Sequence, residues 1–454
     1  MSGPFLGLRY DGAAVVVAGA GISGAAAARV LRGLGAHVTV VDGDPARLAA
    51  LDGFATAQVL PPGTAQVVTS PGWRPTAPLL LAAAAAGIEV IGEVELAWRL
   101  RPPGSAPWLA VTGTNGKTTT VRMLAAILAA AGHRTVAAGN VGLPLLAAVL
   151  APEPYDVLAV ELSSFQLYWS STVVPHTGAI LNVADDHTDW HGSSRDYTTA
   201  KAAIFAADTC VGNADDTVSA ALLDRALGRR VGFTLRVPRS DEVGLVEDLL
   251  VDRAFPDVPG EATELAALSD LTVSGPHNVA NALAAAAIAR SYGVPAAAVR
   301  DGLRAVRADP HRNALVRVLD GVSWVDDSKA TNPHAAAAGL ASYDPVVWIA
   351  GGLLKGADVE DLVRRAASRL RAVVLLGTDR AVLADALARH APEVPVVEVD
   401  RLDTGAMDQA VAAARRLARP GDSVLLAPAA ASMDCFRDYA ERGELFAAAV
   451  LGLG

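Results

Sequence analysis

GTNGKTTT, residues 113–120, follows a short apolar run, Trp108 to Val111, and precedes a long apolar segment that ends at Gly132. The apolar run has the length of a buried strand, and the segment after the loop has the length of a helix. A glycine-rich turn between a strand and a helix gathers backbone N–H groups at the helix N-terminus, where they form an anion site. The stretch therefore predicts a phosphate-binding loop in an α/β domain.

Two side chains of this loop suit a nucleoside triphosphate. Lys117 would reach the outer phosphates, and the Thr118 hydroxyl would ligate Mg²⁺. In the usual P-loop the first glycine lies five residues before the second, whereas Gly113 precedes Gly116 by only three. The alternative is a glycine-rich turn with an unrelated lysine, but the strand before the loop and the helix after it favour phosphate binding.

The rest of the chain alternates strand candidates with helical segments. Val15 to Ala18 and Val38 to Val41 flank a Gly-rich turn and an Ala-rich helix, which together form a βαβ unit. Later strand candidates lie at 157–160, 179–182, 322–325, 346–350, 372–376, 396–399 and 423–427. Such alternation implies mostly parallel sheets that are covered by helices.

The length of 454 residues suggests about three domains. RPPGSAP at 101–107 and ADPHR at 308–312 interrupt the strand–helix pattern and indicate linkers. We predict an α/β protein with three domains: a Rossmann-like N-terminal domain over 1–104, a central P-loop mononucleotide-binding domain over 105–309, and a Rossmann-like C-terminal domain over 310–454.

Composition excludes several classes of function. The net charge is −10 and no Lys/Arg cluster supplies a basic face, so we expect no nucleic-acid partner. No uncharged apolar run reaches the roughly 18 residues of a membrane span, and the N-terminal MSGPFLGLRY lacks a signal-peptide pattern. Cys210 and Cys435 are far apart and have no metal-ligand spacing, which suits a reducing cytosol. We therefore expect a cytoplasmic protein without a membrane span.

A second glycine-rich turn supports a rival hypothesis. GAGISG at 19–24 matches the GxGxxG fingerprint, and Asp42 follows Gly24 at about the distance expected of a ribose-binding acid. Taken alone, this pattern predicts a dinucleotide site and hence an NAD-dependent oxidoreductase. That hypothesis leaves the phosphate loop at 113–120 unexplained.

Further motifs are spread along most of the chain. They are GNVGLP at 139–144, ELSSFQL at 161–167, DDHTDWHG at 185–192, YTTAK at 197–201, GPHNVAN at 275–281, PHR at 310–312, DDSKATNP at 326–333 and GGLLKGAD at 351–358. Together with the shortened loop GTNGKT, they resemble the Mur ligases and their relative folylpolyglutamate synthetase. ELSSFQL with GNVGLP looks most like the D-glutamate-adding member of the family.

The resemblance implies an ATP-dependent amide-bond ligase that acts in peptidoglycan precursor synthesis. Its expected partners are UDP-N-acetylmuramoyl-L-alanine and D-glutamate, joined through an acyl phosphate and a tetrahedral intermediate, and its expected state is a monomer. The expected cofactors are ATP and Mg²⁺ at two sites, because Mg²⁺ and a lysine neutralise charge during phosphoryl transfer. The GAGISG turn would then hold the UDP part of the substrate, since UDP and NAD share a diphosphate and a ribose.

Three alternatives are weighed against this one. A Mur ligase that adds a diamino acid is expected to carry a DNPR-like motif, which the sequence lacks. A folylpolyglutamate synthetase-like ligase should lack a UDP-binding domain before the ATP loop, whereas more than 100 residues precede it here. A non-catalytic nucleotide-binding protein would not need Glu161, His187 and Lys201 together.

The site residues follow from the resemblance, position by position. The catalytic group is Lys117, Glu161, His187 and Lys201, and the metal group is Thr118, Glu161, His187 and Lys201. ATP is expected to contact Gly113, Thr114, Asn115, Gly116, Lys117, Thr118, Thr119, Asn278, Asn281, Arg312 and Asp327. The UDP-linked substrate is assigned to Ile22, Ser23, Asp42, Asn140 and His187. D-glutamate is assigned to Lys329, Thr331, Lys355, Ser432, Met433 and Tyr439.

For three of these residues, an ordinary structural role without any ligand is the alternative to a site role. Glu161 follows an apolar strand, where open α/β sheets place their sites, but it could also be a surface acid. In similar ligases the lysine that matches Lys201 carries a CO₂-derived carbamate, which supports a metal; otherwise Lys201 is a solvated helix residue. Lys355 could be an exposed lysine at the start of a helix, although a cation is unfavourable there.

Overall fold

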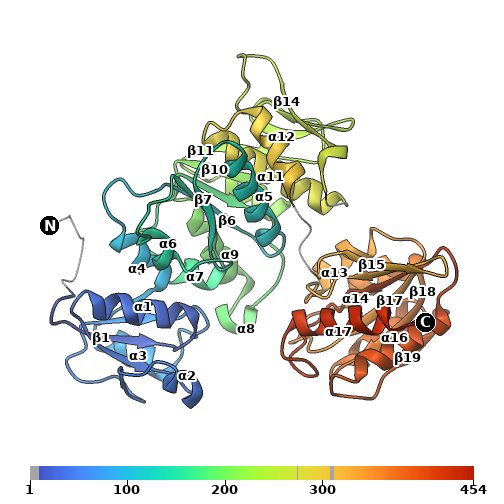
Figure 1. The fold of residues 1–454 in the computed structure, drawn as a ribbon, viewed down its shortest axis with the longest axis horizontal. Coiled ribbons are helices and arrows are strands. Elements are labelled where there is room, and N and C mark those ends of the chain that lie inside the picture. Colours follow the sequence, from blue (N-terminus) through green and yellow to red (C-terminus); the bar gives the residue numbers. More distant parts are fainter. Residues whose placement is uncertain (1–9, 273–274, 307–310) are drawn as a thin grey trace. The chain divides into compact units, whose positions relative to one another are not determined.

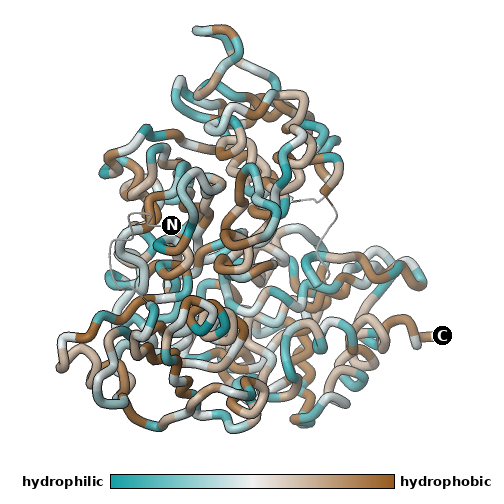
Figure 2. The backbone as a smooth tube through the Cα atoms, turned by 60° about the vertical axis from the view of Figure 1, so that its left-hand side comes forward, coloured by the Kyte–Doolittle hydropathy of each residue, from teal (hydrophilic) through white to brown (hydrophobic). Residues whose placement is uncertain are grey.

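The computed structural model describes residues 10–272, 275–306 and 311–454, which separate into two compact units, Met1–Val306 and Arg307–Gly454 (Figure 1). The predicted linker residues 308–310, the predicted boundary between 309 and 310, and most of the N-terminal segment MSGPFLGLRY lie outside the described residues. Figure 2 shows hydrophobic and hydrophilic segments alternating along the backbone of both units. None of the described helices combines the length and the apolar character needed to cross a membrane.

The described residues up to 104 form a five-stranded parallel sheet in the order β3-β2-β1-β4-β5. Its strands are β1 (Ala14–Ala18), β2 (His37–Val41), β3 (Ala55–Thr56), β4 (Gln66–Thr69) and β5 (Glu89–Gly92), and its helices are α1 (Ile22–Gly33), α2 (Pro45–Ala49), α3 (Pro78–Ala85) and α4 (Glu93–Leu100). The apolar run of β1 is buried, as its composition predicts. The glycine-rich turn therefore lies at the carboxyl end of the central strand of this sheet.

Residues 105–272 and 275–306 form a nine-stranded sheet in the order β14-β13-β12-β11-β10-β9-β6-β8-β7. Its strands are β6 (Trp108–Thr112), β7 (Thr135–Gly139), β8 (Val157–Glu161), β9 (Thr177–Ile180), β10 (Thr209–Asn213), β11 (Arg229–Phe233), β12 (Glu242–Val246), β13 (Leu249–Asp252) and β14 (Thr263–Ala267). Its helices are α5 (Lys117–Ala130), α6 (Leu145–Val149), α7 (Ser164–Tyr168), α8 (Thr188–His191), α9 (Ser194–Ala202), α10 (Thr217–Leu223), α11 (Pro276–Ser291) and α12 (Ala296–Ala305). The strand from which the phosphate loop leaves, β6, lies between β8 and β9.

An apolar core joins these two sheets within the first unit. Leu96 and Leu100 of α4 and Leu145 and Leu146 of α6 belong to one buried cluster, which also includes residues of β1 and β8. The opposite face of the nine-stranded sheet is covered by α5, α11 and α12. The two sheets share this core, and the predicted domain boundary between residues 104 and 105 stays a prediction.

The described part of the second unit, residues 311–454, forms a six-stranded sheet in the order β15-β16-β20-β17-β18-β19. Its strands are β15 (Ala314–Leu319), β16 (Val322–Asp326), β17 (Val346–Gly351), β18 (Leu370–Leu376), β19 (Val396–Glu398) and β20 (Ser423–Leu426), and its helices are α13 (Pro333–Leu340), α14 (Glu360–Ala366), α15 (Arg380–His390), α16 (Ala406–Leu417) and α17 (Tyr439–Leu451). Strands β16, β20, β17, β18 and β19 each pair in parallel with the next one in that order, and β15 pairs with β16 antiparallel.

Antiparallel pairs were not anticipated from the alternation of strands and helices. Strands β15 and β16 are joined by Asp320 and Gly321, both with positive φ (53° and 76°), which is the conformation of a tight hairpin turn. Strands β12, β13 and β14 also pair antiparallel at one edge of the central sheet. An Asp-Gly pair between two strands is a sequence signal for a hairpin. The alternation of strands and helices alone does not reveal it.

Candidate active site

The phosphate loop occupies the turn between β6 and α5. Gly116 has a φ of 84°, in the left-handed region that favours glycine. A Cβ atom at this position would also lie 2.3 Å from Oδ1 of Asn281, which places that predicted ATP residue against the loop. The Lys117 ammonium donates to the carbonyl oxygens of Gly113 at 2.8 Å and Thr114 at 2.9 Å. The loop, its lysine and Asn281 therefore lie together.

Two residues outside the predicted set hold this loop in place. The backbone N–H of Asn115 donates to Asn182 Oδ1 at 2.8 Å, and Asn182 Nδ2 donates to the Asn115 carbonyl at 3.1 Å. The Thr114 hydroxyl lies 2.9 Å from the buried hydroxyl of Tyr197. A signal for Tyr197 was present, because it precedes Lys201 by one helical turn in YTTAK and shares its helix face.

Glu161 ends strand β8, and its register partner on the neighbouring strand β6 is Val111. It is 1% exposed, which excludes the surface-acid alternative. Its Oε1 accepts from Asn140 Nδ2 at 2.7 Å. Among the described residues, its buried Oε2 has no hydrogen-bond partner. An unpaired buried carboxylate oxygen beside a phosphate loop suits a cation, since burial of an uncompensated charge is costly.

The donor set also fits Mg²⁺. No group of three His, Cys, Asp or Glu side chains converges anywhere in the described ranges. Mg²⁺ commonly keeps several waters and binds through one or two carboxylates together with substrate phosphates. Glu161 and the mostly buried Thr118, at the start of α5, would supply the protein ligands of such a site.

His187 lies in an aromatic cluster at the start of α8. Its ring is 4.8 Å from that of Phe165, and its Nε2 is 3.5 Å from Asp186 Oδ2. Burial, together with the positive charges of Lys117 and Lys201, lowers the pKa of His187, whereas Asp186 opposes that shift. A neutral imidazole is the form that binds metals.

Lys201 is 1% exposed, so the alternative of a solvated helix residue is wrong. Its Nζ donates to the Gly113 carbonyl at 2.8 Å and lies 4.6 Å from the centre of the Tyr197 ring. Burial, reinforced by the nearby charge of Lys117, lowers the pKa of Lys201 well below its usual range. The structure thus brings Lys201 to the phosphate loop and favours its neutral amine.

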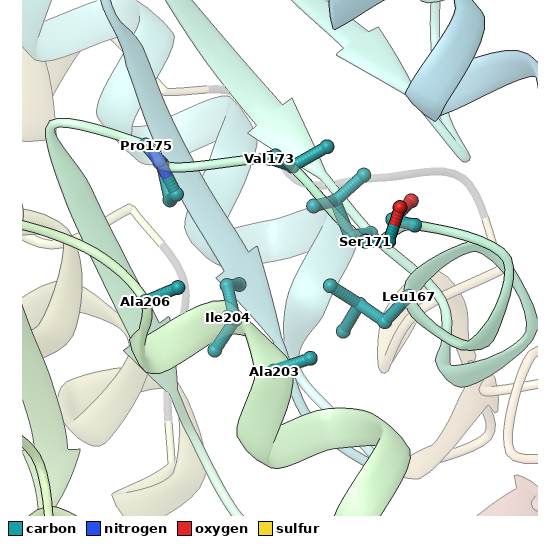
Figure 3. Close-up of a pocket in the computed structure, with 9 residues that line it drawn as sticks. Leu167, Ser171, Val173, Pro175, Ala203, Ile204 and Ala206 are labelled. Carbon is teal, nitrogen blue, oxygen red and sulfur yellow. The ribbon is translucent and has the colours of Figure 1, made fainter.

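An apolar pocket of about 180 Å³ is lined by residues that follow Glu161 and Lys201 in the chain (Figure 3). Leu162, which follows Glu161, and Ile204, which lies three residues after Lys201, are among its lining residues. None of the nine lining residues carries a charge, so the pocket does not suit a polyphosphate.

Of the predicted UDP-binding residues, Ile22 and Ser23 lie in the GAGISG turn and Asp42 contacts it, whereas Asn140 and His187 lie elsewhere in the first unit. Asp42 Oδ2 accepts from the backbone N–H of Ala20 at 2.6 Å, and its Oδ1 accepts from that of Asp44 at 2.8 Å. Ile22, the first residue of α1, is 81% exposed, and no side chain caps this helix. The open helix N-terminus is suited to a diphosphate. Asn140, assigned to the muramoyl part, reaches Glu161 instead of this turn.

The residues predicted to contact D-glutamate lie in loops of the second unit. Leu353 and Ala431 exchange backbone hydrogen bonds of 2.9 Å, which joins the loop of Lys355 to the loop of Ser432. The Lys329 ammonium lies 5.3 Å from the centre of the Tyr439 ring. The remaining members of the set, Thr331 and Met433, lie in these same loops, and Met433 is exposed.

Lys355 is exposed, as its ordinary alternative expects, but it does not start a helix. It has a φ of 53° and precedes α14, which begins at Glu360. The dipole argument drawn from a helix start therefore does not apply. Of the two ATP residues assigned to this unit, Asp327 is partly buried. Burial raises the pKa of Asp327 to about 7, opposed by the hydrogen bond from the Asn313 N–H and by the charge of Arg312.

Known proteins are similar to this chain over most of its length. A family model described as Mur ligase middle domain matches residues 111–289, and one described as Mur ligase, glutamate ligase domain matches 311–430. UDP-N-acetylmuramoylalanine--D-glutamate ligase of Thermobifida fusca is 61% identical, over 98% of this chain and 100% of its own. The chain belongs to the Mur ligase family.

Other relatives of this Mur ligase have the same name. The protein of Streptomyces avermitilis is 58% identical over 98% of this chain and 99% of its own, and that of Mycobacterium bovis is 48% identical over 97% and 96%. A model described as Alanine dehydrogenase/PNT, C-terminal domain matches residues 6–89, in line with a Rossmann-like N-terminal domain. The near-complete coverage by ligases leaves no support for the oxidoreductase alternative.

Solved structures of more distant relatives share the fold. UDP-N-acetylmuramate-alanine ligase of Thermotoga maritima has a TM-score of 0.59 at 19% identity, over 97% of this chain and 100% of its own. Folylpolyglutamate synthase of Mycobacterium tuberculosis has a TM-score of 0.53 at 20% identity, over 76% and 91%. These likenesses, together with the family models, establish the predicted α/β architecture.

Proposed function

We propose that this Mur ligase uses ATP to join D-glutamate to UDP-N-acetylmuramoyl-L-alanine in peptidoglycan precursor synthesis. The observation that carries the proposal is near-full-length identity of 48–61% to ligases with that name. The buried and unpaired oxygen of Glu161 beside the phosphate loop supports it, because the reaction transfers a phosphoryl group between anions.

The proposed roles are those that the resemblance to the Mur ligases implies for each residue. ATP with Mg²⁺ supplies the phosphoryl group that activates the substrate carboxylate. Lys117 would leave its two carbonyl partners for the transferring phosphoryl oxygens, and Thr118 and Glu161 would hold one metal ion. His187 and a carbamylated Lys201 would support a second. The binding sets named above for ATP, the UDP-linked substrate and D-glutamate are part of the same proposal, as are a monomeric state and a cytoplasmic location.

Substrate identity is the first test. Phosphate release should require ATP, UDP-N-acetylmuramoyl-L-alanine and D-glutamate together, because the acyl phosphate needs the matching amine to turn over. A coupled phosphate assay with each candidate amino acid measures this directly. Equal activity with L-glutamate, L-lysine or diaminopimelate would overturn the assignment.

Replacing Asp42 with alanine should raise the KM for the UDP-linked substrate by about tenfold or more with little change in kcat. The reason is that a carboxylate accepting two backbone N–H groups orders the GAGISG turn, and such charge-assisted bonds are among the stronger ones. Asp44→Ala is the matched control, because the Asp44 side chain caps the short helix α2 and pairs with the exposed Arg47 on it. An unchanged KM in Asp42→Ala, or NAD(H) binding with hydride transfer by the wild type, would reject the UDP assignment.

A further inference from the structure

Arg442, on α17, is fully buried, although arginine is rarely buried without a charged partner. Its Nε donates to Ser328 Oγ at 3.0 Å, its Nη2 to the Ser328 carbonyl at 2.8 Å and its Nη1 to the Ala430 carbonyl at 3.1 Å. All three acceptors are neutral. Burial lowers the pKa of Arg442 to about 10, so the guanidinium is still charged at neutral pH. A buried cation is costly, and this one connects two separate loops.

The first loop is tied down through Ser328. The peptide unit that provides the Ser328 carbonyl also contains the N–H of Lys329, which donates to the His311 carbonyl at 3.0 Å. The Ser328 hydroxyl, besides accepting from Arg442, donates to the Tyr439 carbonyl at 2.8 Å. The segment with Asp327 and Lys329 therefore cannot shift without breaking bonds to α17.

The second loop is tied down in the same way through Ala430. The peptide unit that provides its carbonyl contains the N–H of Ala431, which donates to the Leu353 carbonyl at 2.9 Å. Leu353 lies two residues before Lys355, and Ala431 lies next to Ser432. The guanidinium thus links the loops of Lys329 and Ser432 directly, and the backbone pair of Leu353 and Ala431 joins the loop of Lys355 to them.

The helix that carries Arg442 is held close to these loops by its neighbouring residue. A Cβ atom at Gly443 would lie 2.1 Å from His311 Nδ1 and 2.8 Å from Asp326 Oδ2. His311 and Asp326 themselves form a 2.6 Å hydrogen bond. The absence of a side chain at Gly443 therefore lets α17 approach closely enough for Arg442 to reach both loops.

We propose that Arg442 is a positioning residue for the amino-acid substrate, whose guanidinium sets the spacing of Lys329, Lys355 and Ser432. The inference rests on the proposed function, which assigns those three side chains to D-glutamate. A dicarboxylate needs several donors at fixed distances, and a planar guanidinium can hold three acceptors at once. A lysine ammonium keeps the charge but lacks the rigid fork.

Arg442→Lys should raise the KM for D-glutamate by about tenfold and leave the KM for the UDP-linked substrate within about twofold. The UDP-linked substrate is assigned to residues of the first unit, so its KM reports any general loss of structure. Arg290→Lys is the matched control. Arg290 is also buried, but it forms an ion pair with Asp252 and belongs to α11 in the first unit, not to these loops. This variant should leave both KM values unchanged.

Ser328→Ala provides a second variant that removes one acceptor of Arg442 without emptying a buried volume. It should raise the KM for D-glutamate by about threefold, and its effect should be less than additive with that of Arg442→Lys. If Arg442→Lys does not fold, Ser328→Ala alone decides. An unchanged KM for D-glutamate, an equal rise for both substrates, or the same selective rise in Arg290→Lys would overturn the positioning role. A wild type without D-glutamate-dependent phosphate release would instead overturn the proposed function.

Discussion

Lys117→Ala should lower the rate of phosphate release by at least about 10²–10³-fold, the usual loss when one well-placed electrostatic donor is removed. The ammonium now binds two carbonyl oxygens of its own loop, at 2.8 and 2.9 Å, so it lies within the loop that we propose binds ATP. A phosphoryl group in transfer concentrates negative charge, and the loss of this cation leaves that charge uncompensated. Single-turnover phosphate release at saturating substrate measures the effect on the chemical step.

Arg122→Ala is the control for Lys117→Ala. Arg122 is an exposed cation on the same helix, one turn and a half beyond the loop, and its removal should leave the rate nearly unchanged. Thermal unfolding of both variants checks that α5 is retained. Near-normal turnover in a folded Lys117→Ala protein would contradict the assignment of GTNGKTTT to ATP.

The local sequence was sufficient to predict those parts of the site that a single short segment of the chain forms. The strand, the loop and the helix around residues 108–130 follow from apolar runs interrupted by glycines, and Gly116 indeed adopts a positive φ. Glu161 was placed at an active edge because the carboxyl ends of parallel strands meet there, and it is buried beside β6. The loop needed only periodicity and the direction of the strands, whereas the choice of a site role for Glu161 over a surface acid also needed the resemblance to the Mur ligases.

Contacts between distant segments could not be read in the same way. Asn182 and Tyr197 bind the phosphate loop from 67 and 83 residues away, and nothing in the sequence sets those distances. Arg442 was overlooked because a single arginine in a helix reads as a surface residue. The position of Lys355 before α14, with a left-handed backbone, depends on pairing between residues 353 and 431. In each case tertiary packing decided what local propensity left open.

Lys201→Ala should lose at least about 10²-fold in phosphate release, and acetate or formate should restore part of the activity. A buried lysine with a strongly lowered pKa exposes a neutral amine, which is the form that adds to CO₂. In that reaction Nζ of the neutral amine bonds to the CO₂ carbon, one C–O π bond of CO₂ opens and Nζ loses one proton, so a neutral amine becomes an anionic carbamate. A small carboxylate in the space left by the side chain would supply the same negative charge near the metal site.

The same variant separates this carbamate role from the hydrogen bond that Lys201 makes now. Its Nζ donates to the Gly113 carbonyl at 2.8 Å, and a carboxylate cannot donate to that oxygen, whereas methylammonium can. Rescue of Lys201→Ala by acetate or formate, with no rescue of Lys117→Ala, is therefore the expected pattern. Rescue by methylammonium alone would mean that Lys201 acts as an ammonium that braces the loop. Wild-type activity in Lys201→Ala would mean that its burial serves packing only, and in either case the carbamate would be rejected.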